Sequence, residues 1–562
     1  MVGRQSVSTD ILIIGGGSAG AMAAIRAKEV APALDVTVME KGGLRRAGTL
    51  AMGMDAMNVV VIPGVTTEGD YLTAIRLLTE GIYDPAPHRV VARRSLPLVK
   101  KLESWGVKFG HGPDGAYVLH QIHPNAAFTV PMEAPDLKVL LAGTVEQLGV
   151  RAINRTMALS LLLDDRGVCG ALGLDIRSGA LVVCTAKAVI LTAGGAARFG
   201  LPGSGYLFGT LDFPGNAGDG YALGYRAGAS LVNMEYTSNH AITKDIGVPI
   251  TSVAIPLGGI VVNSRGEPVQ SAERSKTGSY FQQSAKRFGE QQAHGPLFLR
   301  VSHLPEERIR EIERILFSTE RPAQKRFFEQ RGIDLRKDDV ELGPTEYKLC
   351  SGHGMAGLLV NDRAETTLPG LYAAGDVASV PFQYLTGAFV MGEVAAEQAC
   401  EAVGRRHQPA VPEAVVADWE REIVRLLAHR PGLEVSPHEF EYKVRRIINE
   451  YVTPPKNEWK LRNAVAWMHA LREELPKVVR VRDAHELSRY WEVECIIDCA
   501  ELSATAGAVR KESRWGPKHR RTDYPERDDA NWLKHVVLRR GAEGTAAVDC
   551  RPVEPAAEGG QA

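Results

Sequence analysis

The chain has 562 residues, of which 44% are hydrophobic, and its formal net charge is −1. This length predicts roughly three or four globular domains, and the near-neutral charge argues against a nucleic-acid partner or an anionic membrane surface. No segment reaches the roughly 18 uncharged apolar residues of a membrane span, and the N-terminus lacks the pattern of a secretory signal. We therefore expect a cytoplasmic protein that does not insert into a membrane.

The seven cysteines form no CxxC pair. Cys495 and Cys499 could share one face of a helix, but two ligands make neither a zinc site nor an iron–sulfur site. The pattern favours buried thiols in a reducing compartment, and we expect no metal bound by this chain.

Hydrophobic periodicity, glycines and prolines divide the chain into segments. The expected elements, in chain order, are a strand at 10–16, a helix at 18–31, a strand at 35–41, helices within 71–106, a strand meander over 155–196, a mixed polar block over 233–345, a strand, turn and helix over 358–410, helices over 412–508, and an irregular charged tail over 509–540.

The first strand and helix meet at a glycine motif. Gly15-x-Gly17-x-x-Gly20 ends the strand and opens the helix, and Glu40 ends the second strand twenty residues after Gly20. The glycines let the backbone approach a pyrophosphate at a helix N-terminus, and an acidic residue at this distance holds a ribose. The pattern therefore predicts a dinucleotide site.

Two distant segments indicate a flavin. In 366–380 a strand ends in Gly-Asp, and Asp376 is the expected partner of the ribityl chain of FAD. The helix expected to begin near Gly387 would direct its positive end toward the flavin, which favours an anionic reduced flavin. The segment 190–197 is a further strand that ends in glycines. NAD proteins do not need these elements, so we expect FAD.

With these motifs, the chain resembles the flavoprotein subunits of the fumarate reductase and succinate dehydrogenase superfamily, which includes L-aspartate oxidase, and looks most like the adenylylsulfate reductase flavoprotein branch. The resemblance covers nearly the whole chain and rests on "RAGTLAMGMDAMN" (46–58), "NAGDG" (216–220), "NMEYTSNHA" (233–241), "PTEYKLCSGHGMAGLLVN" (344–361), "GLYAAGD" (370–376) and "ESRWGPKHRRTDYPERDDANWLKH" (512–535).

The resemblance implies an α/β fold: a Rossmann-like FAD-binding domain in two segments, an inserted α+β capping domain and a C-terminal helical domain. The implied boundaries are 1–232 and 346–410 for the FAD-binding domain, 233–345 for the capping domain, 411–508 for the helical domain and 509–562 for a C-terminal tail. The residues expected to contact FAD are Gly15, Gly17, Ser18, Ala19, Gly20, Glu40, Lys41, Gly48, Thr49, Ala193, Gly194, Asp219, Gly375, Asp376 and Gly387. Gly48 stands where membrane-bound relatives carry a histidine linked to FAD, so FAD should be held non-covalently.

The substrate end departs from the family pattern. Neither 251–263 nor 380–389 contains the arginine that the family uses there, so a bidentate carboxylate clamp is missing and a C4 dicarboxylate is a poor substrate guess. Asn58 matches an asparagine near the sulfite of adenylylsulfate reductases, whereas Ile242 replaces an expected arginine. We expect a more apolar pocket near Tyr384, suited to a larger or less charged substrate.

Two histidines are the expected proton carriers, because an unperturbed imidazole titrates near neutrality. His240 and His353 match histidines that touch substrate in the resembled family, and the alternative is that each only hydrogen-bonds backbone. Lys244 and Tyr384 are further catalytic candidates, and Glu346, with Asn58, is a substrate-binding candidate. His120 and His123 could be ligands in the cap or surface residues.

The tail 509–540 carries ten Lys or Arg against five Asp or Glu. It is expected to be a solvated, salt-bridged segment or a docking face for an acidic, ferredoxin-like 4Fe-4S subunit. The preferred hypothesis is an FAD-dependent oxidoreductase that passes electrons between an organic or sulfur-containing substrate and flavin N5, coupled to such an iron–sulfur partner. The alternatives of a stand-alone oxidase and of a flavin-binding scaffold stay open, as does assembly into a homo- or hetero-oligomer.

Overall fold

The computed structural model describes residues 3–553 except for 55, 203–211, 247, 249, 256, 270–294, 318–321, 429–431, 516–517 and 543. The final part of the expected tail, 554–562, lies outside the described residues.

The largest sheet among the described residues has seven strands, with the order β6-β2-β1-β9-β8-β7 and with β16 paired to β9. Its strands are β1 (Arg4–Ile14), β2 (Val36–Glu40), β6 (Arg151–Asn154), β7 (Thr156–Asp164), β8 (Gly167–Asp175), β9 (Leu181–Leu191) and β16 (Leu371–Ala373). The pairs β1–β2, β1–β9, β2–β6 and β9–β16 are parallel, whereas β7–β8 and β8–β9 are antiparallel. The βαβ unit and the meander expected from the sequence therefore join through β9.

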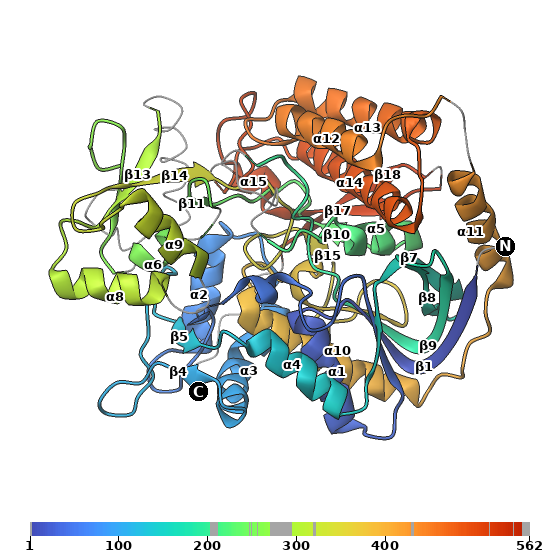
Figure 1. The fold of residues 1–562 in the computed structure, drawn as a ribbon, viewed down its shortest axis with the longest axis horizontal. Coiled ribbons are helices and arrows are strands. Elements are labelled where there is room, and N and C mark those ends of the chain that lie inside the picture. Colours follow the sequence, from blue (N-terminus) through green and yellow to red (C-terminus); the bar gives the residue numbers. More distant parts are fainter. Residues whose placement is uncertain are drawn as a thin grey trace.

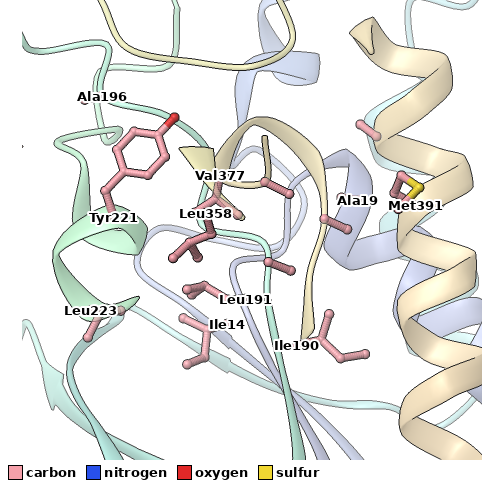
Figure 2. Packing of buried hydrophobic residues seen from close by; sticks show 14 of the residues in the cluster. Ile14, Ala19, Ile190, Leu191, Ala196, Tyr221, Leu223, Leu358, Val377 and Met391 are labelled. Carbon is pink, nitrogen blue, oxygen red and sulfur yellow. The ribbon is translucent and has the colours of Figure 1, made fainter. Parts of the chain in front are cut away.

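Helices α1 (Ser18–Val30), α5 (Asp219–Ala227) and α10 (Tyr384–Val403) pack against this sheet. Further helices pack on them: α4 (Leu137–Gln147) on α1, α3 (Pro85–Ser104) on α10, and α2 (Glu68–Leu78) on α3. Figure 1 shows α1 and α10 side by side, and Figure 2 shows Ile14, Leu191, Val377 and Met391 packed between sheet and helices. These side chains are buried, so burial of apolar surface holds the loop after β1 in place.

Short elements complete this half of the molecule. They are the 3₁₀ helices η1 (Thr49–Met52) and η2 (Gly375–Val377), and the strands β3 (Ala56–Met57), β4 (Lys108–Phe109), β5 (Val130–Glu133), β10 (Leu231–Val232) and β15 (Gly357–Leu358).

The region after β10 has a separate apolar core. Its elements are β11 (Ala241–Thr243), α6 (Thr251–Ala254), β12 (Ile260–Val262), β13 (Leu297–Arg300), α8 (Glu306–Leu316), α9 (Pro322–Arg331) and β14 (Val340–Pro344). The strands form a sheet in the order β11-β14-β13-β12, and Figure 1 shows this unit at the left of the molecule. The core cluster running from Ile250 to Leu342 is distinct from the main one.

The C-terminal part is helical, as expected, and ends in a hairpin. Its elements are α11 (Glu413–Leu427), α12 (Pro437–Ile447), the π-helical turn η3 (Ile448–Val452), α13 (Glu458–Val478), α14 (Ala484–Val509), α15 (Asp529–Trp532), β17 (Lys534–Arg540) and β18 (Ala546–Pro552). β17 pairs with β10, which returns the end of the chain to the centre of the molecule. None of the described helices is both long and apolar enough to cross a membrane.

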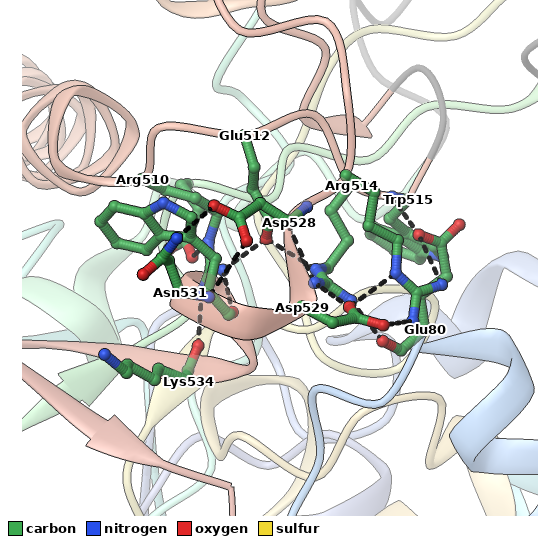
Figure 3. A network of polar contacts seen from close by, with 12 residues as sticks. Glu80, Arg510, Glu512, Arg514, Trp515, Asp528, Asp529, Asn531 and Lys534 are labelled. Carbon is green, nitrogen blue, oxygen red and sulfur yellow. Dashed lines mark hydrogen bonds and ion pairs between the residues drawn. The ribbon is translucent and has the colours of Figure 1, made fainter.

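The tail carries the expected ion pairs but is only partly solvated. Six of its polar side chains are at most 2% exposed: Arg510, Glu512, Arg514, Lys518, His519 and Arg521. Arg510 pairs with Glu235 and Glu512, and Arg514 pairs with Glu512, as Figure 3 shows for the latter residues. The exposed stretch 522–531 carries four Asp or Glu against one Arg. Four of the ten basic residues, Arg510, Arg514, Lys518 and Arg521, are therefore withdrawn from the surface, whereas Lys511, Arg520, Arg527, Arg539 and Arg540 stay exposed.

Candidate functional site

An elongated cavity runs along the carboxyl ends of β1, β2 and β9 and on to the start of α10. Its lining includes the following residues expected to contact FAD: Gly15, Gly17, Ser18, Ala19, Glu40, Lys41, Gly48, Thr49, Ala193, Gly194, Asp219, Gly375 and Asp376. Thr156, Met157 and Ala158 line it beside Glu40, whereas His353, Tyr384 and Ala388 line it beside Asp376. The cavity therefore joins sequence segments that are more than 300 residues apart.

Two glycines have geometric reasons to be glycine. A Cβ at Gly20 would clash with the carbonyl oxygen of Gly15, so Gly20 lets α1 pack against the loop and does not itself line the cavity. Gly48 has φ +86°, and a Cβ there would lie 2.9 Å from the Cα of Gly17. A side chain at position 48 would therefore be strained and would crowd the loop.

Acidic side chains mark one end of the cavity. The Glu40 carboxylate accepts hydrogen bonds from the backbone N–H of Gly16 and of Gly42, both at 2.6 Å. The Lys41 amine bridges Asp219 and Glu492, at 2.8 Å each. Burial opposes the charge of Lys41, but the two carboxylates overcome it and raise its pKa to about 12. Within the described part of the chain, the buried Oδ1 of Asp219 has no hydrogen-bond partner, so it is available to a ligand.

Asp376 marks the other end. It belongs to η2 and lines the cavity together with Gly375. Burial, and then the nearby Asp212 carboxylate, raise the pKa of Asp376 to about 6. A carboxyl group in this position can donate or accept a hydrogen bond near neutral pH.

The helix expected to begin near Gly387 begins at Tyr384, so that expectation is wrong by one helical turn. Gly387 lies within the first turn, and a Cβ there would clash with the Gln383 side chain. Glycine thus serves packing inside α10, and Gly387 does not line the cavity. Phe382 and Tyr384 have φ values of +55° and +51°. Positive φ is unusual for aromatic residues and marks a strained entry into the helix.

These features fit FAD. A glycine loop at the N-terminus of α1 suits a pyrophosphate, a buried carboxylate on β2 suits a ribose, and Asp376 of η2, which lines the same cavity, suits a polar ribityl chain. The match rests on the cradle itself, since Gly48 and Gly17 line the cavity without side chains and Gly20 lets α1 close against the loop.

Aromatic rings gather where the cavity meets α10. The ring of His353 lies 5.4 Å from that of His240 and 5.1 Å from that of Tyr384, and His123 lies 5.1 Å from Tyr384. The two predicted histidines are thus brought together, with His353 lining the cavity and His240 behind it. His123, one of the open alternatives, is also part of this group and hydrogen-bonds the backbone oxygen of Asn58.

The histidines are not poised near neutrality. Burial, and then the charges of Lys348 and Lys518, lower the pKa of His353 to about 4, with Asp212 opposing them. Burial and the same two lysines hold the pKa of His240 well below its usual range. Both imidazoles are therefore neutral at pH 7, and a neutral imidazole can donate one hydrogen bond and accept another.

Sequence reasoning missed two buried lysines. Lys348, 1% exposed, pairs with Asp212. Lys518, 2% exposed, comes from the tail and donates to the backbone oxygen of Asn239 at 2.6 Å and to Ser238 Oγ at 3.2 Å. These two amines add positive charge behind the pocket that we expected to be more apolar. Lys518 lies in the basic tail segment "GPKHRR", and such a segment is typical of a solvated surface, so its burial was not predicted.

The remaining predicted residues are dispersed. Lys244 does not reach the rings, because it lies on the surface of the inserted region and pairs with Glu341 at 2.6 Å. Glu346 is buried and its charge acts on Lys348 and Arg445. Asn58 contacts the group through its backbone oxygen, which hydrogen-bonds His123. Among the described residues, no cluster of three or more His, Cys, Asp or Glu is arranged to hold a metal.

Two family models match the chain. The model described as "FAD binding domain" matches residues 10–387, and that described as "Fumarate reductase flavoprotein C-term" matches residues 441–558. An uncharacterized FAD-dependent oxidoreductase of Methanocaldococcus jannaschii is 26% identical over 95% of this chain and 96% of its own. One subunit of the fumarate reductase (CoM/CoB) of Methanothermobacter marburgensis is 25% identical over 95% of this chain and 97% of its own.

A solved structure is similar over almost the entire chain. Adenylylsulfate reductase from Archaeoglobus fulgidus superposes with a TM-score of 0.87 at 25% identity and covers 99% of this chain and 97% of its own. The cavity, the family models and this likeness agree. The chain belongs to the fumarate reductase and succinate dehydrogenase flavoprotein superfamily, and it is an FAD-dependent oxidoreductase.

Proposed function

We propose that the enzyme exchanges electrons between FAD and an organic or sulfur-containing substrate that carries an anionic group and lies against His353, His240 and Tyr384. Bound FAD supplies the two-electron carrier of the reaction. The observation that carries the proposal is the position of His353 and Tyr384 at the end of the cavity, with His240 against His353 and two buried amines nearby.

The proposal gives these residues different roles, according to their side-chain chemistry. Neutral His353 and His240 orient the substrate by hydrogen bonds, and either imidazole can accept a proton in the direction of substrate oxidation. Tyr384 lies against His353 and shapes the pocket. Lys348 and Lys518 make the pocket attractive to an anion. Because they are point charges and not bidentate arginine forks, a C4 dicarboxylate is still expected to bind weakly.

We propose that FAD is held without a covalent bond. Position 48 has no side chain, and its φ of +86° suits glycine. The purified protein should be yellow, and acid precipitation should release all of its FAD. Flavin fluorescence that stays with the denatured chain on a gel would contradict this.

We also propose the division into domains at 1–232 with 346–410, 233–345, 411–508 and 509–562. The separate apolar core within the inserted region supports the second of these units. Burial of the tail argues that it is an integral part of the molecule and not an appendage. A cytoplasmic location also stays a prediction.

We propose that electrons enter or leave through a separate 4Fe-4S protein. The support is that the described residues hold no metal-binding cluster and that the M. marburgensis relative is named as one subunit of a larger enzyme. Because Arg510, Arg514, Lys518 and Arg521 are buried, much of the positive charge of the tail is not available for docking, and the proposal assigns the partner to no particular surface.

One experiment tests the electron route without knowledge of the substrate. FAD in the purified enzyme is reduced anaerobically by light and a chemical donor, and its reoxidation is followed after mixing with a 4Fe-4S ferredoxin or with air-saturated buffer. We expect faster reoxidation by the ferredoxin. Reoxidation in air at catalytic speed would favour a stand-alone oxidase. A flavin that neither acceptor reoxidises would favour a scaffold.

A screen of acceptors tests the substrate class. The reduced enzyme is mixed anaerobically with fumarate, with adenylylsulfate and with unsaturated acids that carry one carboxylate. We expect reoxidation by an acceptor with a single anionic group at the reacting end. Equal or better reoxidation by fumarate would show that a second carboxylate is recognised by residues other than an arginine clamp.

A further inference from the structure

The tail places one amine at the junction of three segments. Lys518 follows the buried Arg514 and lies over Trp515, with its amine 5.6 Å from the ring centre. Its amine donates to Asn239 O at 2.6 Å and to Ser238 Oγ at 3.2 Å. Ser238 Oγ in turn donates to the backbone oxygen of His353 at 3.0 Å. Lys518 is thus tied to the segments that carry both predicted histidines.

The two buried lysines differ in their counter-charges. Lys348 has a carboxylate partner in Asp212. Among the residues that the structure describes, Lys518 has no carboxylate partner, and the two oxygens that accept from its amine are neutral. An ammonium group has three donors, so one remains for a ligand. A buried cation without a counter-ion is costly, and an anion from outside can supply the missing charge.

We propose that Lys518 is the anchor for the anionic group of the substrate and that it takes up a proton from solvent when this group binds. The inference rests on the proposed function, because it assumes that the substrate lies against His240 and His353. The binding reaction is balanced: a neutral amine, one proton and one anion give an ammonium–anion pair.

Electrostatics support the direction of this change. The groups that act on Lys518 are Lys348, whose charge opposes a second cation, and the Cys350 thiol, which favours it. Burial is the larger effect, and together they lower the pKa of Lys518 to about 7. His240 and His353, which also face it, are neutral at this pH. An anion beside the amine raises its pKa again.

The pKa of Lys518 sets how proton uptake depends on pH. Below pH 7 Lys518 is already charged, so an anion binds without proton uptake. At pH 8 only about one tenth of the amines carry a proton, so binding should take up about 0.9 proton per site. Above pH 7 the dissociation constant of the anion should rise about tenfold per pH unit.

The test is calorimetry on the FAD-loaded enzyme with sulfate and with acetate as simple probe anions. Titrations at pH 6, 7 and 8 in buffers of different ionisation enthalpy give the number of protons taken up on binding. We expect uptake near zero at pH 6 and about 0.9 at pH 8. Sulfate and acetate distinguish preference for a sulfur oxyanion from preference for a carboxylate.

Two variants separate anchoring from proton uptake. Lys518→Arg keeps a permanent charge, so it should bind the anion with no uptake and with little pH dependence. Lys518→Met should bind at least tenfold more weakly at pH 6. Lys477→Met, at an exposed lysine in the helical domain, is the control and should behave as wild type. The FAD content of each variant shows whether it folds.

Proton uptake that persists in Lys518→Arg would overturn the inference, because a histidine would then carry the proton. An unchanged affinity of Lys518→Met for the anion would show that Lys518 does not anchor it. An enzyme whose FAD is reducible and reoxidised by ferredoxin, yet whose anion binding ignores Lys518, would disprove the inference alone. An enzyme that binds the anion through Lys518 but whose FAD exchanges no electrons would disprove the proposed function instead.

Discussion

The two ends of the cavity are built in different ways. The end near Glu40 is made mainly of backbone from a contiguous βαβ unit, whose glycines and one carboxylate fall within residues 15–40. The end near His353 is made of side chains from the junction after β10, from the segment before η2, from the start of α10 and from the tail. The first end uses short-range chain geometry, whereas the second depends on long-range packing of buried charges.

The largest effect should come from the tail that supports the second end. Arg514 is fully buried and bonds Glu512, Asp529 and the Glu80 backbone (Figure 3). Arg514→Met leaves the buried Glu512 carboxylate with fewer partners and should lower the free energy of unfolding by about 3–5 kcal/mol. The urea midpoint measures this.

Arg527→Met is the matched control for Arg514→Met, because Arg527 bonds the same Asp529 carboxylate but its side chain is 45% exposed. This substitution should lower the free energy of unfolding by less than about 1 kcal/mol. Equal effects of the two substitutions would mean that the tail is not buried as described.

The next effect concerns the backbone end. Gly20→Ala places a Cβ against the Gly15 carbonyl, which is backbone and cannot rotate away. Overpacking costs about 1–3 kcal/mol, and we expect the upper end of this range in the affinity for FAD. Gly43→Ala is the control, because a Cβ there meets nothing within 4 Å. The FAD dissociation constant, measured by flavin fluorescence, should change only in Gly20→Ala.

Replacing the carboxylate of Glu40 should weaken FAD binding by a comparable or smaller amount. Both of its oxygens accept backbone hydrogen bonds, and Glu40→Gln replaces one acceptor by a donor. We expect FAD binding weaker by about 1–3 kcal/mol. Glu146→Gln, at an exposed carboxylate paired with Arg45, should leave it unchanged. An unaltered dissociation constant in Glu40→Gln would show that Glu40 does not hold the ribose.

The smallest effect is a pH dependence of stability. Burial lowers the pKa of Lys456 to about 7, whereas an unfolded lysine titrates near 10.5. Above pH 7 the unfolded chain therefore binds more protons, and stability should rise with pH by about 1.4 kcal/mol per unit for this amine. Urea midpoints at pH 7 and 8 should show a smaller rise in Lys456→Met than in wild type.

The difference between the two ends also explains what could be predicted from the sequence. The glycine loop, Glu40, Asp376 and the order of elements follow local rules, and the structure brings them to one cavity as expected. β1 is longer than expected because Arg4–Thr9, a polar segment, pairs with β9. Propensity alone does not reveal a strand that is held by its neighbour.

The second end could not be predicted in the same way. The basic residues of the tail resemble a solvated segment, and only the fold shows that Arg510, Arg514 and Lys518 are buried. Lys244 follows His240 by four residues, and this proximity predicts a place near the site, but β11 carries it to the surface. The pKa values of the histidines depend on Lys348 and Lys518, which no local pattern connects to them.

The most direct test of the account is whether the two ends are parts of one site. Sulfate is titrated at pH 6.5 into the FAD-loaded enzyme while the visible absorption band of the flavin is recorded. The account predicts a saturable shift of this band with the dissociation constant found by calorimetry, also in Lys518→Arg. Calorimetric binding that leaves the flavin spectrum unchanged would show that the anion site lies away from the redox end of FAD and would contradict the account.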